Sequence, residues 1–180
     1  MRLFDVFKKK VAAPESAPAV PEPIETAEGD DVACAPVTGK AMPMSEVPDP
    51  VFSGEVLGAG CAFVPEDDFV YAPVSGTVTV VMGHAVGIKS TSGIEVLVHC
   101  GIDTVNLQGR GFTGFVAQGD EVKAGQPILK MDRKVIDEEG YQDCVVLAVS
   151  NTADFQAVTM AVEGGAIVSA GDAVLMVTCK

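Results

Sequence analysis

Two stretches of this 180-residue chain repeat one another at a distance of 46 residues. Val116–Met131 recurs as Val162–Val177, and each copy has a glycine turn, a valine, a second glycine turn and an apolar run. A shorter pair behaves alike: residues 35–39 read Ala-Pro-Val-Thr-Gly, and residues 72–76 read Ala-Pro-Val-Ser-Gly. Since a solenoid needs about three or more repeats, two copies predict the two pseudo-symmetric halves of one small domain.

From Val32 onward, Gly, Pro or Asp interrupts the chain every eight to twelve residues. The intervening runs are rich in β-branched side chains: Val78–Val81, Val86–Ile88, Ile94–Val98, Ile128–Met131, Cys144–Val149 and Ala173–Val177. Short, evenly spaced runs of this kind are typical of a sandwich or barrel. We therefore predict an all-β fold, an antiparallel β-sandwich or barrel-sandwich hybrid with pseudo-duplicated halves. At most short helices are expected, and Asp154–Ala161 is the one candidate.

The overall charge restricts the function. The chain has 12 Lys and Arg against 25 Asp and Glu, a formal net charge of −13, which argues against binding a phosphate backbone. No apolar run reaches the about 18 residues of a membrane-spanning helix, and the N-terminus lacks the apolar region of a signal peptide. The cysteines are odd in number and form no CxxC pair, so we expect buried free thiols in a cytoplasmic protein. They are Cys34, Cys61, Cys100, Cys144 and Cys179.

The first 31 residues differ in composition from the rest. Residues 2–11 combine four basic side chains and one acidic one with an apolar helical face made of Leu3, Phe4, Phe7 and Val11. This segment is either a solubilising tail or a helix that contacts the inner face of the membrane peripherally. Alternating Pro, Ala and Glu follow as far as Asp31, a composition typical of a flexible tether. We assign residues 1–31 to the basic amphipathic N-terminus and tether and residues 32–180 to one folded domain.

The chain contains two histidines, His84 and His99, on either side of a predicted hairpin. Residues 90–93 (Ser-Thr-Ser-Gly) separate two β-type runs, which is a hairpin signal. With the turn centred between Thr91 and Ser92, His84 lies directly opposite His99, and such pairs have Cβ atoms about 4.5–5.5 Å apart. Two adjacent imidazoles suit phosphoryl transfer or metal binding, or they are structural histidines of a sheet. The pairing alone leaves these alternatives open.

The segment around the second histidine is more specific. Residues 97–105 read Leu-Val-His-Cys-Gly-Ile-Asp-Thr-Val, so that a strand ends at a histidine and continues through glycine into an acidic, hydroxyl-bearing turn. This motif resembles the active-site segment of the glucose-type enzyme IIA of the bacterial phosphoenolpyruvate-dependent sugar phosphotransferase system. The resemblance extends through residues 72–78, 83–89 and 116–129 and covers about residues 33–180. It implies an antiparallel β-sandwich that carries a phosphoryl group between proteins, with no cofactor and no resident metal.

The resemblance also implies roles for individual residues. His99 matches the histidine that accepts the phosphoryl group on Nε2 from the histidine phosphocarrier protein, and His84 matches the supporting histidine. Two acidic and two apolar side chains match the family's partner-docking residues: Asp49, Asp103, Val51 and Phe52. The expected function is a phosphohistidine relay that passes phosphate to the IIB domain of a sugar permease during sugar uptake. Some members share a zinc site with a regulated target protein.

Three features depart from the family pattern. Cys100 stands where an aliphatic residue is usual, and we expect it to pack on the opposite face from His99. The link from Gly76 to His84 is about two residues shorter than usual. Met82-Gly83 replace a Thr that commonly hydrogen-bonds the supporting histidine, a role open to Thr77 or Thr79. An apolar surround is expected to keep water from His99, made of Leu97, Val86, Val51 and Phe52.

Other functions fit parts of the sequence. A regulatory protein-binding module of the same fold, with little or no phosphoryl turnover, is the main alternative. His99-x-x-x-Asp103 suggests a zinc metallopeptidase, but two histidines leave zinc short of ligands. The internal repeat also suits a biotinyl or lipoyl carrier, although residues 131–134 (Met-Asp-Arg-Lys) match a modified-lysine site only loosely.

Overall fold

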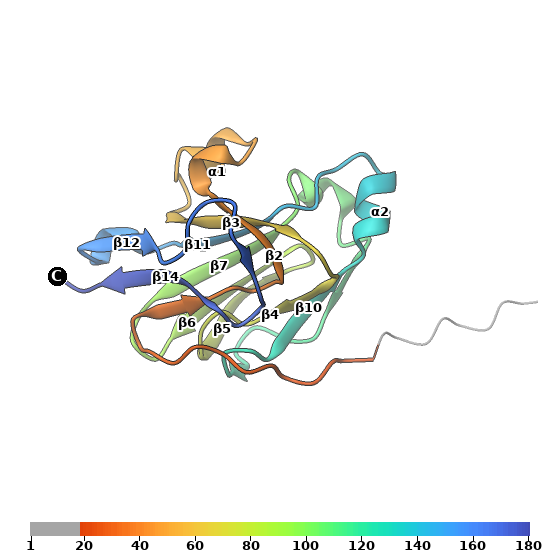
Figure 1. Ribbon diagram of the computed structural model, residues 1–180. Helices are drawn as coiled ribbons and strands as arrows, with labels where there is room; N and C mark the ends of the chain where they lie inside the picture. The colour runs from red at the N-terminus through yellow and green to blue at the C-terminus, as the bar shows by residue number, and fades with distance from the viewer. Residues whose placement is uncertain (1–18) are drawn as a thin grey trace, which may run out of the picture.

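The structure, a computed structural model, describes residues 19–180, which form three antiparallel sheets around an apolar interior (Figure 1). One sheet has eight strands in the order β13-β2-β3-β11-β7-β6-β5-β9, and two have three strands, in the orders β1-β14-β12 and β4-β10-β8. The strands are β1 (Val32–Cys34), β2 (Gly39–Pro43), β3 (Ala59–Pro65), β4 (Phe69–Tyr71), β5 (Gly76–Met82), β6 (Ala85–Ser90), β7 (Glu95–Cys100), β8 (Phe112–Gly114), β9 (Glu121–Val122), β10 (Pro127–Met131), β11 (Val145–Val149), β12 (Ala157–Met160), β13 (Ile167–Val168) and β14 (Ala173–Thr178). The helical turns are η1 (Met44–Glu46), α1 (Pro50–Ser53), η2 (Thr104–Leu107), α2 (Arg133–Glu138) and η3 (Thr152–Asp154). The predicted all-β sandwich with at most short helices is confirmed.

The six predicted β-runs coincide with β5, β6, β7, β10, β11 and β14. The prediction of a helix at Asp154–Ala161 is wrong, because Ala157–Met160 forms β12 and pairs with β14. Val158 and Met160 pack partly buried against the core from this strand. That tertiary packing outweighs a weak local preference for helix.

The internal repeat corresponds to two structurally equivalent halves. In the first half β9 and β10 follow one another, and in the second half β13 and β14 do so. The strand β9 pairs with β5, where Val122 lies opposite Gly76. The strand β13 pairs with β2, where Val168 lies opposite Gly39. The two short Ala-Pro-Val sequences therefore lead into equivalent strands, as pseudo-symmetric halves of one domain require.

The same hydrogen bonds recur in the loops of both halves. The Ser75 hydroxyl accepts from the Ala124 N–H at 2.9 Å, and the Thr38 hydroxyl accepts from the Ala170 N–H at 3.0 Å. One residue later, the N–H groups of the two repeat glycines donate to backbone carbonyls at 2.9 Å: Gly125 to Ala72 and Gly171 to Ala35. Each Ala-Pro-Val loop is thus fastened to the glycine turn of its own half.

Both faces of the eight-stranded sheet are covered by apolar side chains. Its inner face belongs to the main core, in which Phe63, Ile88, Leu147 and Leu175 are among the largest fully buried side chains. The outer face carries a smaller cluster made of Met44, Val47, Phe52, Ala62, Ile102, Cys144, Val146 and Ala148. Alternate residues of β11 therefore enter different clusters, which explains why this strand reads as a continuous apolar run.

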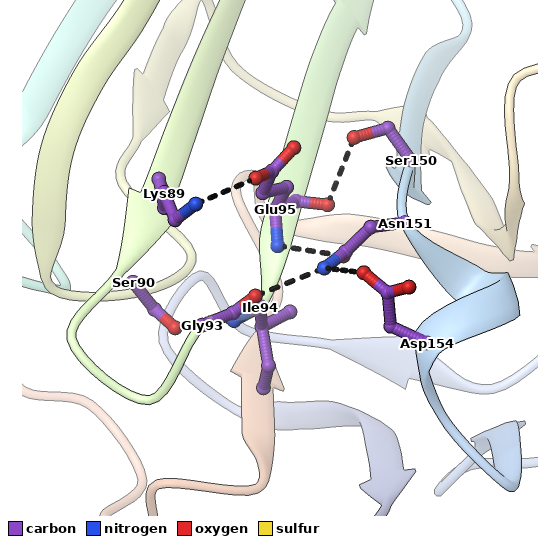
Figure 2. A network of polar contacts seen from close by, with 8 residues as sticks. All are labelled: Lys89, Ser90, Gly93, Ile94, Glu95, Ser150, Asn151 and Asp154. Carbon is purple, nitrogen blue, oxygen red and sulfur yellow. Dashed lines mark hydrogen bonds and ion pairs between the residues drawn. The ribbon is translucent and has the colours of Figure 1, made fainter.

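Asn151 ties the β6–β7 hairpin to the chain that follows β11 (Figure 2). Its side-chain Oδ1 accepts from the Glu95 N–H at 2.9 Å, and its Nδ2 donates to the Gly93 carbonyl at 2.9 Å. The Ser150 N–H also donates to the Glu95 carbonyl, at 2.8 Å. The amide of Asn151 thus extends the backbone pairing of β7 and β11 beyond the end of β11 and fixes the start of β7.

Residues 24–31, here called the N-terminal strap, lie along the domain and differ from the flexible tether expected there (Figure 1). The Ile24 N–H donates to the Gly125 carbonyl at 3.0 Å, and the Ala27 N–H donates to the Gly171 carbonyl at 2.9 Å. The strap therefore bonds to the equivalent glycine turn in each half of the domain. Sequence composition did not reveal this because the bonds come from backbone groups, which proline-rich and acidic segments also carry.

The two repeat glycines make room for the strap. Gly125 has a φ of 81° and Gly171 a φ of 95°, in the left-handed region that favours glycine. A Cβ added at Gly171 would overlap the carbonyl oxygen of Glu25, and one at Gly125 would overlap that of Ile24. Glycine is needed at both positions for its φ and for the closeness of the strap.

Residues 1–18 lie outside the described part of the chain, and so does the segment 2–11 for which membrane contact is predicted. No helix among residues 19–180 is long and apolar enough to cross a membrane.

Replacing Gly171 by Ala is expected to destabilise the domain and release the strap. The new Cβ overlaps Glu25, so the strap must move in addition to the unfavourable φ. An alanine in the left-handed region costs about 1–2 kcal/mol, and loss of the Ala27 hydrogen bond adds about 1 kcal/mol. Urea unfolding gives the total, and hydrogen exchange at the Ala27 amide reports strap release directly.

Gly165→Ala is the matched control. Gly165 has a φ of 91°, but the nearest atom to an added Cβ is Lys40 Cε at 3.8 Å. This variant should lose only the free energy of unfolding that the unfavourable φ costs, and hydrogen exchange at the Ala27 amide should be unchanged. Equal protection of Ala27 in both variants would contradict a docked strap.

Candidate active site

The hairpin that carries the histidines has a register one residue away from the predicted one. Ala85, and not His84, lies directly opposite His99. The cause is the loop, which contains three residues between Ser90 and Ile94 and closes through a Ser90 N–H to Ile94 carbonyl hydrogen bond of 2.7 Å. Gly93 completes it with a φ of 91°. A three-residue loop ending in a left-handed glycine shifts the pairing by one residue relative to a two-residue turn.

The two imidazoles nevertheless meet, with ring centroids 4.8 Å apart and ring planes at 77°. His84 lies in the turn between β5 and β6 and not within a strand, so strict alternation of faces does not apply to it. Its carbonyl accepts from the Cys100 N–H at 2.8 Å, which fixes its backbone beside the end of β7. The predicted imidazole pair is present, but it is formed by a turn residue and a strand residue.

The shifted register changes the surround of His99. Leu97 shares the face of His99, whereas Val86 pairs with Val98 and is buried in the main core on the other face. The prediction that Val86 shields His99 is therefore wrong, because a one-residue slip moves each side chain of a strand to the opposite face.

The loop after His99 is held by tight packing. Gly101 has a φ of 84°, and a Cβ there would overlap Thr104. The buried Thr104 hydroxyl donates to the Cys100 carbonyl at 2.6 Å, and the Ile102 side chain enters the outer cluster. The Gly-Ile-Asp-Thr motif thus has a structural reason: each of Gly101, Ile102 and Thr104 fixes the chain beyond His99.

An apolar wall from the segment of η1 and α1 closes one side of His99. The Phe52 ring lies 4.9 Å from the His99 ring between centroids, at 61°. Phe52 is only 5% exposed, so it forms this wall, although it was expected on a docking surface. Val146, directly opposite His99 on β11, is fully buried beside it.

The remaining predicted docking residues flank this wall. Asp49 is the N-cap of α1, and its Oδ1 accepts from the N–H groups of Val51 at 2.8 Å and Phe52 at 3.2 Å. Val51 is 41% exposed. Asp103 is exposed at the start of η2, with a φ of 59°. The carboxylates of Asp49 and Asp103 both raise the pKa of His99. The four predicted docking residues and the histidine pair therefore lie in one region of the domain.

Burial favours the neutral form of both imidazoles. Burial, assisted by the adjacent His84, lowers the pKa of His99 to about 4. The Gly101 backbone and the carboxylates of Asp49 and Asp103 act in the opposite direction. Burial also lowers the pKa of His84, which is 6% exposed. A neutral imidazole has a free lone pair and can act as a nucleophile.

The two nitrogens of His99 differ in their surroundings. Nδ1 is buried and has no hydrogen-bond partner of standard geometry within residues 19–180, while the Gly101 backbone interacts with the ring. The His99 side chain as a whole is partly exposed. Nε2 is therefore the nitrogen available to a reactant that approaches from solvent.

Cys100 faces away from the site. It is fully buried in the main core, and burial raises the pKa of its thiol. This confirms the expected packing role, since a buried neutral thiol is a poor nucleophile. The other cysteines are also free, with Cys34, Cys61 and Cys144 buried and Cys179 exposed.

Neither candidate threonine takes the place of the missing one. The Thr77 hydroxyl donates to Glu121, and Thr79 lies at a bulge of β5 near Gly87. The described residues include no side chain that hydrogen-bonds the His84 imidazole, and they contain no group of three or more His, Cys, Asp or Glu that could hold a metal ion.

Sequence reasoning missed several residues of the site. Phe112 of β8 lies 6.4 Å from His84 between ring centroids, at 62°. Met82 and Val105 carry exposed apolar side chains on the segments that contain His84 and follow His99, 47% and 57% exposed respectively. No local pattern marks Phe112, because its proximity to His84 depends on how β8 is placed against the β5–β6 turn.

Comparison with known proteins gives consistent results. Residues 32–155 match the family model of the phosphoenolpyruvate-dependent sugar phosphotransferase system, EIIA 1. The glucose-specific EIIA component of Oceanobacillus iheyensis is 41% identical over 120 residues, which are 66% of this chain and 73% of that protein. The mannose-specific EIIBCA component of Corynebacterium glutamicum is 45% identical over 123 residues, 67% of this chain. This chain spans only 18% of that longer relative.

A solved structure agrees in fold as well. The glucose permease IIA from Mycoplasma capricolum superposes with a TM-score of 0.68 and 34% identity, over 80% of this chain and 93% of that one. The fold, the family model and the relatives lead to one assignment. The chain belongs to the EIIA 1 family of the phosphoenolpyruvate-dependent sugar phosphotransferase system.

Proposed function

We propose that this protein is a phosphohistidine relay in which His99 receives a phosphoryl group on Nε2 and hands it on. The observation that supports this most is the state of His99: a neutral, partly exposed imidazole with Nδ1 buried, 4.8 Å from a second imidazole between ring centroids. Such a group is a nucleophile with one accessible nitrogen and a hydrogen-bonding neighbour.

In the first step the Nε2 lone pair of His99 attacks the phosphorus carried by the donor's phosphohistidine. The new N–P bond forms as the donor's N–P bond breaks, and the electron pair returns to the donor imidazole. The proton of His99 stays on Nδ1, beside the Gly101 backbone. His84 donates an N–H to the phosphoryl oxygens, whose charge the transition state spreads. In the second step a nucleophile of the acceptor displaces His99 by the same chemistry in reverse.

The donor is proposed to be the histidine phosphocarrier protein and the acceptor the IIB domain of a sugar permease. The name EIIBCA of one relative places a IIB and an IIA unit in a single chain, which supports IIB as the acceptor. The exposed Val51 with Asp49 beside it, and Asp103 near His99, offer apolar and acidic groups to a partner. A net charge of −13 favours association with a basic partner face. The relatives' names specify different sugars, so the proposal names none.

The carrier alternative does not fit the position of its lysine. A biotinyl or lipoyl carrier needs its modified lysine at a hairpin tip, whereas Lys134 lies within α2. The regulatory alternative, a binding module without turnover, is separated by experiment: it predicts binding to the phosphocarrier or a target protein but no phosphate adduct.

His99→Ala is expected to abolish labelling by the phosphorylated phosphocarrier, because no other imidazole can offer an accessible nitrogen at that point. His84→Gln should still take up phosphate but pass it to a IIB domain about 100- to 1,000-fold more slowly, since one oxyanion donor is altered. Intact mass measures the adduct, and rapid quench measures each step. Labelling that persists in His99→Ala would refute the assignment of His99.

The pH dependence should follow the lowered pKa of His99. With a pKa of about 4 rather than 6.5, Nε2 remains unprotonated from pH 8 down to pH 6, so uptake should be flat there. Uptake should fall only as the pH approaches 4, where protonation removes the lone pair. NMR titration of the His99 ring checks this independently of the donor, and Asp103→Asn should lower its pKa further because that carboxylate raises it. A His99 midpoint near 6.5 would contradict the burial described.

The basic segment at residues 2–11 is proposed to bring the protein to the inner face of the membrane. Its Lys and Arg side chains would meet anionic headgroups and its apolar face would enter the interface. Deleting residues 1–10 should slow transfer to membrane-embedded permeases more than uptake from the soluble donor. Equal rates with both partners would mean that the segment is only a tail.

A further inference from the structure

The turn that carries His84 contains two residues, Gly83 and His84, because Met82 pairs with Ala85 across the hairpin. Neither Gly83 nor His84 has a positive φ. Two-residue hairpin turns normally use positive φ values, for which glycine is favoured. The glycine at position 83 is therefore not explained by its backbone conformation.

Gly83 is explained by what lies against it. A Cβ added at this position would lie 2.7 Å from the Gly109 Cα, closer than real Cβ contacts allow. The backbones of the β5–β6 turn and of the loop after η2 thus touch directly, with no side chain between them. Gly109 itself has a φ of 86°, and its own Cβ position is open.

The loop on the other side of this contact is well fixed. The Arg110 N–H donates to the Leu107 carbonyl at 3.0 Å, and the Phe112 N–H donates to the Gly109 carbonyl at 3.1 Å. Gly111 packs against Val135 of α2, where an added Cβ would lie 3.1 Å from Val135 Cγ1. The loop is therefore a firm support between η2 and α2.

The same loop also contacts the His84 ring through Phe112, at 6.4 Å between centroids. The described side chains give the His84 imidazole no hydrogen bond, so its orientation depends on packing and on its backbone. On one side its carbonyl is bonded to Cys100, and on the other side Gly83 rests on Gly109.

We infer that the Gly83–Gly109 backbone contact, together with the Phe112 ring, is the positioning element that sets the His84 imidazole against His99. Gly83, Gly109 and Phe112 touch no reacting atom and act through His84. The inference rests on the proposed function for its kinetic consequence, but the placement of the ring can be measured without phosphate.

Gly83→Ala is the decisive variant, because its Cβ forces the turn away from Gly109 without any cost in φ. The chain has two histidines, so both imidazoles can be followed unambiguously by NMR. We expect weaker ring-to-ring NOEs and a His99 midpoint that rises toward 6.5, since His84 helps to lower the pKa of His99. Onward transfer should slow by up to about 100-fold, the loss that a misplacement near 1 Å can cause, while uptake changes less.

Gly140→Ala is the control, since it lies outside the contact, its Cβ points into open space and only its φ of 82° is disfavoured. It should lose stability with both imidazole titrations unchanged. If Gly83→Ala does not fold, Phe112→Leu replaces it, because this variant removes the ring against His84 and keeps an apolar side chain. Unchanged NOEs and titrations in a folded Gly83→Ala or Phe112→Leu variant would overturn the inference.

These readouts separate two failures. A wild-type protein that takes up no phosphate would refute the relay, and the NOEs and titrations would still test the positioning element. Normal relay activity with a displaced His84 ring in Gly83→Ala would refute the kinetic role of the contact.

Discussion

The pairing register of β7 is the constraint on which the site depends. Three residues in the hairpin loop place Ala85 opposite His99, and the same register on the other side places Val146 opposite His99. Because faces alternate along a strand, His99 is directed to the outer face and Cys100 to the core. A loop shorter by one residue would turn Cys100 to the outer face and His99 to the core. The amide of Asn151 bonds to Gly93 and Glu95 at the start of the same strand, and so reinforces the register that the loop sets.

A histidine on the outer face of a sheet would ordinarily be solvated. Here the segment of η1 and α1 lies over that face and supplies a second apolar cluster, which includes Phe52 against the His99 ring. Burial under this cover is the largest influence on the pKa of His99. The chemistry of the site thus comes from a layer that is separate from the main core. Substitutions in this cover can change reactivity while the sandwich remains intact.

Much of the fold could be predicted from the sequence, since β-branched runs and glycine turns are local signals. The repeat predicted equivalent halves. The hydroxyls of Thr38 and Ser75 make equivalent hydrogen bonds, which explains why the Ala-Pro-Val sequence occurs in both halves. The histidine pair was also predictable, but its exact register was not: the pattern of residues 90–93 indicates a two-residue turn, whereas Gly93, with its positive φ, is a third loop residue. Strands of two or three residues were not predictable, because they exist only through pairing with distant partners.

The environment of the site was less predictable than its residues. Phe52 is buried because α1 folds over the sheet. Phe112 reaches His84 because of the position of β8. Both are relations between segments far apart in the chain, and sequence periodicity records only the burial of each segment by itself. The family resemblance implies roles for His84 and His99. It does not predict the Gly83–Gly109 contact or the Phe112 ring beside His84, which depend on the turn that this chain has.

The docked strap determines where the described chain joins the domain. It runs on the side of the domain opposite α1, and Asp30 accepts a hydrogen bond from Ser92 at the end of the hairpin distant from His99 (Figure 1). Within residues 19–180, the backbone hydrogen bonds to the domain therefore begin at Ile24 and not at Val32. Because the strap and α1 lie on opposite sides of the domain, and Phe52 of α1 packs against His99, the described chain enters the fold away from the face that carries the histidine pair.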